Sequence, residues 1–441
     1  MSTVLIAIIL FALTYVLLFA FPKWRSYIAF GAAVVFSVWL GLISREISFT
    51  AADVIGSIDF NVLMMIAGTM GIVSLFIESK MPMLIADVML SKFKSVKTAI
   101  VAMAVLSGVV SAFVDNVATV LMIAPIAFAV CQKQGISPVN AIISITVSSN
   151  LQGAATLVGD TTSILLGGHL NMTFFDFFVF RGRPGIFWTV EIGAALTVLI
   201  LLYVFRKETH SLTLSGRTEV TDFVPSYLMG GVVTLLILAS FIPEPTNVAL
   251  HTLYELRNGI ICMTLLAIGI VINAVRNKNL GALRLVFKEM DYHTILLLAS
   301  LFVVIGGITE AGVISRLAHA LVRMGGGSHF LMYTIIVFAS VLISAVVDNI
   351  PYTLTMLPVV AGVAGEMGVE QYALCFGLLV GATLGGNITP IGASANITGI
   401  GMLRKEGYEV NTKDFMRISV PFTLTAVLSG YVLVWLIWGV L

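Results

Sequence analysis

Residues 111–125 read Ser-Ala-Phe-Val-Asp-Asn-Val-Ala-Thr-Val-Leu-Met-Ile-Ala-Pro, and residues 344–358 read Ser-Ala-Val-Val-Asp-Asn-Ile-Pro-Tyr-Thr-Leu-Thr-Met-Leu-Pro. Each stretch places an Asp-Asn pair, a Thr and a later Pro inside apolar sequence. A carboxylate in such a run costs several kcal/mol unless it has partners or water, so each Asp is a functional-site candidate. The two copies are 233 positions apart, which indicates an internal repeat.

The composition indicates a membrane protein. The 441-residue chain is 59% hydrophobic and 11% charged, whereas a soluble domain is about 25% charged. Apolar runs such as Val4–Phe21 and Ile186–Phe205 match the ~30 Å hydrocarbon layer of a bilayer. The alternation typical of a β-barrel is absent. We therefore predict an all-α polytopic protein, and the net charge of +1 gives no indication of a nucleic-acid partner.

The order of segments predicts two repeats, residues 1–206 and 224–441, joined by a polar cytoplasmic linker at 207–223. The first repeat contains three spans, an amphipathic piece, a re-entrant hairpin, a broken helix and a last span, predicted at 4–21, 27–43, 58–77, 81–93, 98–132, 138–168 and 186–206. The second repeat has the same order, with spans at 224–241, 257–275, 292–309 and 418–440, a hairpin at 328–365 and a broken helix at 370–403.

Basic residues predict the topology. If neither hairpin crosses the membrane, each repeat crosses five times, so the second repeat is inverted relative to the first. With the N-terminus outside, 18 Lys and Arg residues lie on one side and 6 on the other, which satisfies the positive-inside rule. This predicts a multi-pass protein of the inner (plasma) membrane with both termini outside.

The two helix breaks predict binding sites. Glycines and Pro390 interrupt residues 152–163 and 385–396, and irregular backbone survives in a membrane where it lines a cavity or is buried. A half-helix N-terminus attracts an anion, and freed carbonyls bind Na⁺. The residues predicted to bind cation or substrate are Asp115, Asn116, Thr119, Asn150, Thr156, Gly159, Asp160, Thr161 and Thr162 in the first repeat, and Asp348, Asn349, Thr353, Asn387, Thr389, Gly392, Ser394 and Asn396 in the second.

Other roles are open for these residues. Glycines in membrane helices also allow close helix packing, and Asp115, Asp160 and Asp348 are suited to helix N-caps. Three isolated cysteines form neither a disulfide framework nor a metal-binding spacing. We expect no cofactor other than Na⁺.

An enzyme is a weak alternative. Intramembrane aspartyl proteases carry a Gly-x-Gly-Asp motif, whereas this chain reads Leu157-Val158-Gly159-Asp160 and lacks the first Gly. A channel is another alternative, because broken helices also line pores. The duplicated layout favours a secondary transporter over both.

At these residues the chain resembles the ion transporter superfamily, and within it the arsenite permease/P protein (pink-eyed dilution) group. The matching stretches are 115–121, 385–396 and Glu406-Gly407-Tyr408. The first broken helix departs from the group's pattern, because Thr161-Thr162-Ser163 replaces Pro-Pro-Asn and Gln152 replaces Gly. The superfamily is similar to the divalent anion:Na⁺ symporters, which include Na⁺-coupled dicarboxylate transporters.

This resemblance implies a homodimer, in which each protomer has a scaffold domain and a transport domain that moves as an elevator. Members handle arsenite, dicarboxylates, citrate, sulfate or Na⁺/H⁺ exchange. We therefore expect a Na⁺- or H⁺-coupled carrier of a small anion, either arsenite or another inorganic oxyanion or a carboxylate, and a Na⁺/H⁺ antiporter is the main alternative. One cation site is expected between 115–119 and 156–162, and a related one between 348–353 and 389–396, with substrate between them.

Overall fold

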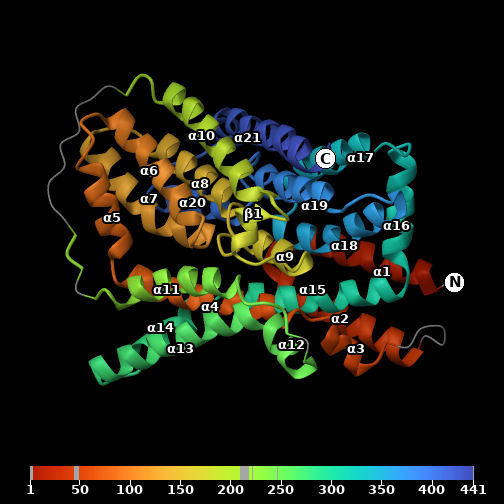
Figure 1. Ribbon diagram of the computed structural model, residues 1–441. Coiled ribbons are helices and arrows are strands. Elements are labelled where there is room, and N and C mark those ends of the chain that lie inside the picture. Colours follow the sequence, from red (N-terminus) through yellow and green to blue (C-terminus); the bar gives the residue numbers. More distant parts are fainter. Residues whose placement is uncertain (1–2, 44–48, 209–217, 221, 246, 441) are drawn as a thin grey trace.

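The computed structural model describes residues 3–43, 49–208, 218–220, 222–245 and 247–440. These residues form two stacked layers of helices (Figure 1). Among them, nine helices are long and apolar enough to cross a membrane. The prediction of an all-α polytopic membrane protein is therefore confirmed. Of the predicted linker, residues 209–217 and 221 lie outside the described part of the chain.

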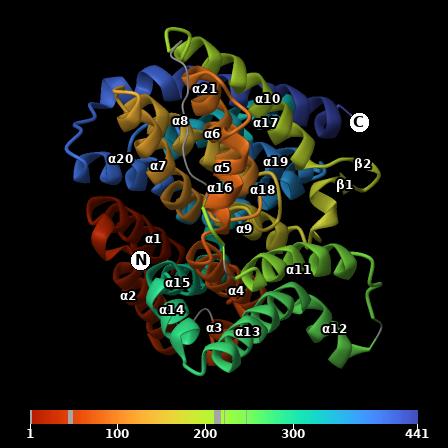
Figure 2. The same cartoon turned by 90° about the vertical axis from the view of Figure 1, so that its left-hand side faces the viewer.

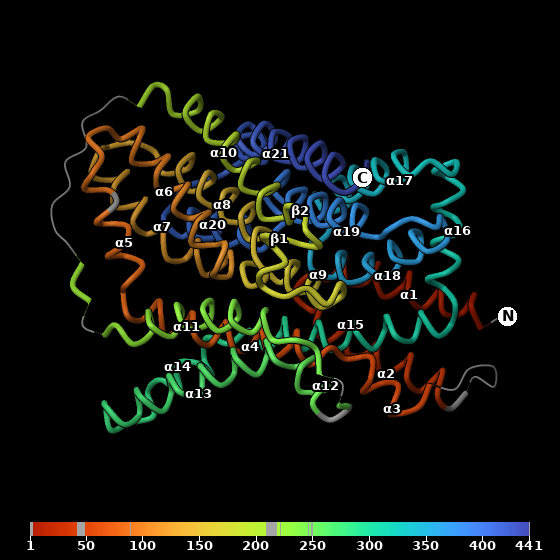
Figure 3. The backbone as a smooth tube through the Cα atoms, viewed as in Figure 1, coloured from red at the N-terminus to blue at the C-terminus, as the bar shows by residue number. Residues whose placement is uncertain are grey.

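The lower layer in Figure 1 mixes helices from both repeats. α4, from the first repeat, packs against α11 and α13 from the second, while α15, from the second, packs against α1 and α2. Figure 3 shows α4 in orange-red beside green α11 and α13, and Figure 2 shows the two groups on opposite sides of the layer. The lower-layer helices are α1 (Thr3–Ala20), α2 (Arg25–Val38, extended by a π-helical turn at Trp39–Ile43), α4 (Phe60–Glu78), α11 (Val224–Ala239), α13 (Arg257–Asn277) and α15 (Tyr292–Glu310).

Local sequence explains the starts of α4 and α15. The side chain of Asp59 accepts a hydrogen bond from the backbone N–H of Val62 at 2.9 Å, and Asp291 accepts one from Thr294 at 3.0 Å. Such N-caps satisfy donors that the first helical turn leaves unpaired. Small residues then bring helices together, since a Cβ on Gly68 of α4 would lie 2.6 Å from the Cβ of Cys262 on α13.

The upper layer holds the hairpins and the broken helices. Each hairpin consists of two helices joined by a short turn, and each broken helix consists of two helices separated by an irregular segment. The hairpins are α6 (Val96–Ser111) with α7 (Asn116–Lys133), and α17 (His329–Ser344) with α18 (Asn349–Met367). The broken helices are α8 (Val139–Gly153) with α9 (Thr161–His169), and α19 (Tyr372–Leu379, extended by a π-helical turn at Val380–Leu384) with α20 (Ser394–Lys405). α10 (Ile186–Val204) and α21 (Thr412–Val434, extended at Trp435–Gly439) complete the layer.

Shorter elements connect the layers or lie at their edges. α5 (Met81–Leu90) and α16 (Val313–Met324) stand at opposite ends of the molecule in Figure 1. They fall where the sequence predicts amphipathic pieces. The elements not predicted are α3 (Ala51–Gly56), α12 (Val248–Glu255), α14 (Gly281–Glu289), single 3₁₀ turns at Pro22–Trp24 and Phe175–Phe177, and an antiparallel pair of strands, β1 (Val179–Phe180) and β2 (Arg183–Pro184).

The starts of corresponding helices give the repeat its register. α2 and α13, α4 and α15, and α5 and α16 begin 232 positions apart. From the hairpins onward, α6 and α17, α7 and α18, α8 and α19, and α9 and α20 begin 233 positions apart. The offset between the repeats therefore changes by one residue where the hairpins begin. Two inverted repeats, each with a hairpin and a broken helix, make up the fold.

Candidate functional site

Both hairpin turns end in an aspartate that caps the next helix. The Asp115 carboxylate accepts hydrogen bonds from the backbone N–H groups of Val117 at 3.0 Å and Ala118 at 3.1 Å. The Asp348 carboxylate accepts one from Ile350 at 3.1 Å. Capping therefore explains why Asp is suited to each turn. In each carboxylate the second oxygen takes no part in the cap. That of Asp115 retains capacity for a ligand, whereas that of Asp348 is bound by Arg25 at 2.7 Å.

In the first repeat the broken helix packs against the hairpin turn through backbone carbonyls. The Thr156 hydroxyl donates to the carbonyl of Ala112. A Cβ at Gly159 would lie 2.6 Å from the carbonyl oxygen of Gly153 and 2.8 Å from that of Ser111. Glycine is required here because carbonyl oxygens crowd around its Cα. The break and the turn thus gather several oxygens suited to a hard cation.

The second repeat reproduces this arrangement. The Thr389 hydroxyl donates to the carbonyl of Ala345. A Cβ at Gly392 would lie 2.5 Å from the carbonyl oxygen of Gly386 and 2.8 Å from that of Ser344. The two breaks are therefore equivalent in backbone structure.

The side chains at the two breaks differ. Asp160 is buried and caps α9, accepting a hydrogen bond from the backbone N–H of Thr161 at 2.8 Å and one from the Thr162 hydroxyl at 2.9 Å. Ala393 stands at the corresponding position of the second break. There Asn396 instead spans the break, donating from its side-chain amide to the carbonyls of Gly386 and Thr389, each at 3.1 Å. A carboxylate thus occurs at the first break only.

Buried amides join the two repeats at the centre of the upper layer. The Asn150 side chain accepts a hydrogen bond from the Asn116 amide and donates to the carbonyl of Thr383, each at 2.9 Å. The Asn387 amide donates to the carbonyl of Val147 at 2.9 Å. These bonds make Asn150 and Asn387 structural links, and both lie away from the cavity described next.

A cavity of about 420 Å³ separates the layers and collects residues from both repeats. The predicted residues that line it are Asp115, Asn116, Asp160, Thr161, Asn349 and Ser394. Lower-layer residues contribute further carboxylates, Glu78, Glu289 and Asp291. The other predicted residues do not line it, namely Thr119, Asn150, Thr156, Gly159, Thr162, Asp348, Thr353, Asn387, Thr389, Gly392 and Asn396.

Four helix N-termini meet at this cavity. Asn116, Thr161, Asn349 and Ser394 are the first residues of α7, α9, α18 and α20, and all four line it. Helix N-termini carry partial positive charge, which favours anions. Asp115, Asp160 and Asp348 already cap α7, α9 and α18, and of the four helices α20 begins without a side-chain cap. Among the described residues that line the cavity, none is Lys or Arg and five are Asp or Glu. The cavity therefore offers helix dipoles to an anion and carboxylates to a cation.

Asp348 has a partner that the sequence reasoning missed. An Arg25 guanidinium nitrogen lies 2.7 Å from an Asp348 carboxylate oxygen, so the start of α2 in the lower layer is bound to the hairpin turn in the upper layer. No Arg or Lys is near either break in the sequence, and only the fold brings Arg25 there. The repeat could have drawn attention to Arg25, because Arg257 occurs at the corresponding position of the second repeat, 232 positions later.

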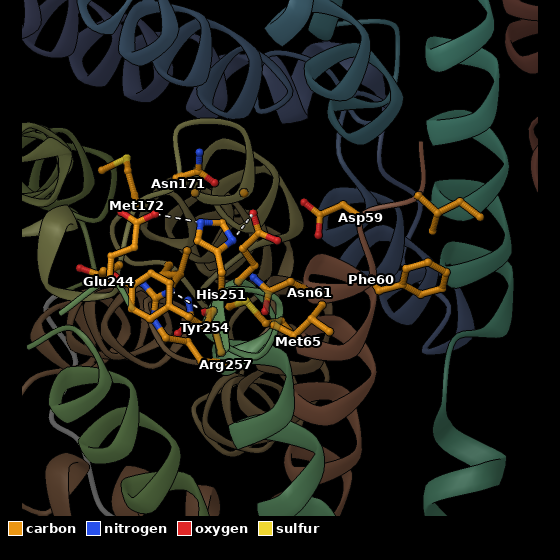
Figure 4. Close-up of a pocket in the computed structure, with 18 of the residues that line it drawn as sticks. Asp59, Phe60, Asn61, Met65, Asn171, Met172, Glu244, His251, Tyr254 and Arg257 are labelled. Atoms are coloured by element: carbon orange, nitrogen blue, oxygen red, sulfur yellow. Dashed lines mark hydrogen bonds and ion pairs between the residues drawn. The ribbon is translucent and has the colours of Figure 1, made fainter. Parts of the chain in front are cut away.

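A second cavity, of about 700 Å³, lies at the start of α4 and α13. Figure 4 shows Arg257, Tyr254 and His251 at this cavity, with Asp59 at its edge. None of the residues predicted from the sequence lines it. Among the described residues, no group of three or more His, Cys, Asp or Glu side chains is arranged to hold a metal ion.

Comparison with known families places the chain among membrane transporters. A family model described as "Citrate transporter" (CitMHS) matches residues 8–276 and 255–441. The chain belongs to this family, which lies in the ion transporter superfamily. The resemblance predicted from the hairpin and broken-helix motifs is confirmed, and the protein is a transporter and not an enzyme.

Two relatives and one solved structure agree with this assignment. The "Uncharacterized transporter Rv2685" of Mycobacterium tuberculosis is 28% identical over 437 residues, covering 98% of each chain. The human P protein is 26% identical, over 85% of this chain and 53% of its own. The crystal structure of the Alcanivorax borkumensis YdaH transporter, 16% identical, covers 94% of this chain and 97% of its own with a TM-score of 0.60, which supports the fold.

Proposed function

We propose that this transporter couples the movement of Na⁺ or H⁺ to the movement of a small carboxylate anion. The observation that carries the proposal is the meeting of four helix N-termini, at Asn116, Thr161, Asn349 and Ser394, around one cavity. Asp115, Asp160 and Asp348 cap three of these helices, whereas α20 begins without a side-chain cap. The free N–H groups of α20 and the partial positive charge of all four ends would attract an anion without a fixed basic side chain. The family description, citrate transporter, supports a carboxylate as the anion.

The coupling cation is proposed to bind beside each hairpin turn. Carbonyls of Ser111 and Gly153 crowd Gly159, and those of Ser344 and Gly386 crowd Gly392. Carbonyl and carboxylate oxygens are ligands that hard cations prefer. A cation held there would also offset the charge of an anion in the acidic cavity.

A Na⁺/H⁺ antiporter is the second candidate, and the acidic lining favours it. Five carboxylates line the cavity, and none of the described lining residues is basic. In such an exchanger the cavity would bind Na⁺ or protons alternately and need no anion.

We further propose an elevator mechanism, in which the upper layer moves against the lower layer. The cavity lies between the layers, and the upper layer carries both hairpin turns and both breaks. Alternating access around a site in the membrane is the general working principle of inverted-repeat carriers. A homodimer in the plasma membrane, joined through the lower layer and with both termini outside, completes the proposal.

Flux measurements in proteoliposomes distinguish the two candidates. Uptake of radiolabelled citrate is measured under an inward Na⁺ gradient, an inward proton gradient and no gradient, and a pH-sensitive dye reports proton movement without organic anion. Gradient-dependent, saturable uptake supports the symporter. Na⁺-driven proton movement without an anion supports the antiporter, and uncoupled conduction without saturation rejects both.

A further inference from the structure

Two arginines occupy equivalent positions in the repeats. Arg25 is the first residue of α2 and Arg257 is the first residue of α13. They are 232 positions apart, the same offset that relates Asp59 to Asp291. Each arginine therefore stands at the start of a lower-layer helix, on opposite faces of an inverted fold.

The surroundings of Arg25 connect the two layers. A guanidinium nitrogen donates to the Asp348 carboxylate at 2.7 Å, and the Nε donates to the Leu18 carbonyl at 3.4 Å. The Asp348 side chain is 11% exposed and that of Arg25 is 22% exposed. Because Asp348 lies in a hairpin turn, this ion pair holds the upper layer at the face where α2 begins.

Arg257 lacks such a partner. Its guanidinium lies over the Tyr254 ring at 3.8 Å and donates to the Tyr254 carbonyl at 2.7 Å. Its Nε is buried without a hydrogen-bond partner, and no carboxylate among the described residues pairs with it. It faces the 700 Å³ cavity (Figure 4). The Arg257 side chain is half-buried, and Asp59, Asp176, Glu244 and Glu255 line the same cavity without an ion pair to it. A guanidinium with an unpartnered Nε beside a cavity leaves room for a carboxylate to bind in another conformation.

The equivalent partner of Arg257 is Asp115, which lies elsewhere in this conformation. The backbone N–H of Gly259, two residues after Arg257, donates to the side chain of Asn61 at the start of α4. Asp115 instead shares a small cavity with Ile66, Thr69, Met70 and Val73, further along α4. At 1.5 Å rise per residue, the level of Asp115 is about 13 Å along α4 from that of Asn61.

We propose that Arg25 and Arg257 hold the two hairpin turns alternately. Arg25 binds Asp348 in the conformation seen here, and Arg257 binds Asp115 after the upper layer has moved about 13 Å along α4. Asp115 and Asp348 belong to one layer and the arginines to the other, so one ion pair excludes the other. This inference rests on the proposed alternating access.

The exchange has a consequence for the binding site. In this conformation Asp348 is paired and stays outside the 420 Å³ cavity, while Asp115 lines it. In the opposite conformation the repeat relation exchanges these roles. Each arginine thereby neutralises the carboxylate that is not facing the cavity, and the other carboxylate remains available to a cation.

The test measures the distance between the layers in variants of either arginine. Spin labels are placed at Ile55→Cys in α3 and Val179→Cys in β1, both exposed positions, after the three buried cysteines are replaced by alanine. Pulsed electron resonance in liposomes then gives the populations of the two distances. Arg25→Gln is expected to raise the population of the opposite conformation about fivefold or more, and Arg257→Gln to lower it by a similar factor, in line with ~1 kcal/mol per ion pair.

Two controls separate an ion pair from damage. Arg276→Gln removes an arginine from the other end of α13 that pairs at the surface with Asp222, and it should leave the populations unchanged. Arg25→Lys retains the charge and should restore the parent distribution. Shifts in the same direction for Arg25→Gln and Arg257→Gln, or no shift in either, overturn the exchange.

Flux is measured on the same preparations, so that two failures remain distinct. A parent that performs gradient-coupled transport, but whose distances do not respond to either arginine, rejects the exchange alone. A parent without gradient-coupled flux rejects the proposed function itself.

Discussion

The two hairpin turns carry the same Asp-Asn pair and form the same helix cap, but they meet different surroundings. Asp115 faces a cavity lined by carboxylates, whereas Asp348 is bound to Arg25. The sequence does contain an arginine equivalent to Arg25. It is Arg257, 232 positions later, and by the repeat relation its partner would be Asp115. The two hairpin turns therefore stand differently relative to the lower layer. In a carrier with inverted repeats and alternating access, each single conformation is expected to give equivalent residues of the two repeats different contacts.

Substitution of the glycines at the two helix breaks should lower transport the most, and by the same factor in both repeats. Gly159→Ala and Gly392→Ala would each place a Cβ about 2.5–2.6 Å from a carbonyl oxygen. Overpacking of this kind costs about 1–3 kcal/mol, and because it distorts the proposed cation sites we expect flux to fall about tenfold or more. Proteoliposome uptake measures this. Gly365→Ala in α18 is the matched control, because a Cβ there meets nothing within 4 Å.

Substitution of the hairpin carboxylates should have the second largest effect, and its effect on stability should differ between the repeats. Asp115→Asn and Asp348→Asn are each expected to weaken the dependence of transport on Na⁺ or pH while the protein remains folded. Asp348→Asn should also lower stability by roughly 1–2 kcal/mol, because it leaves the partly buried Arg25 without its counter-charge. Thermal unfolding in detergent reports the second effect. Unchanged cation dependence in both variants would remove these carboxylates from the coupling mechanism.

Substitution of the buried amides should have the third largest effect, mainly a loss of stability. Asn150→Ala removes two hydrogen bonds, from Asn116 and to Thr383, whereas Asn387→Ala removes one, to Val147. At about 1 kcal/mol per bond, Asn150→Ala should destabilise more. The comparison is made by the thermal midpoint of the purified variants. Equal midpoints would show that the link between the repeats does not depend on Asn150.

The smallest effect is expected at the periphery of the molecule, in α3. Thr50 and Asp53 form a reciprocal cap at the start of α3, and hydrogen bonds from the Thr50 side chain and backbone hold the pKa of Asp53 below its ordinary value of 3.8. A lowered pKa means that the cap stabilises α3 at neutral pH and is lost as the pH falls through that pKa. Thr50→Ala should therefore reduce hydrogen-exchange protection of α3 at pH 7 and leave transport unchanged. Protection that is unaltered at pH 7 would contradict the role of the cap.

Much of the fold could be predicted because its signals are local or periodic. The apolar runs gave the long spans, and the repeated Asp-Asn pair and the glycine-rich breaks located the hairpins and broken helices within a few residues. The short elements α3, α12 and α14 were missed because their polar surroundings resemble loops. At the site, the sequence pointed to Asp115, Asn116, Asp160, Thr161, Asn349 and Ser394, which line the cavity. It could not separate these from Asn150 or Thr156, whose polar groups bond within the upper layer.

The sequence by itself determined the repeat, the helix caps and the places where the helices break. These depend on residues within a turn or two of one another, where an Asp meets free N–H groups and a Gly accepts crowded carbonyls. Only the tertiary structure decided that Arg25 meets Asp348 while Arg257 does not meet Asp115. Such pairs join two layers through residues far apart in the sequence, and no local pattern encodes how one layer is placed on the other.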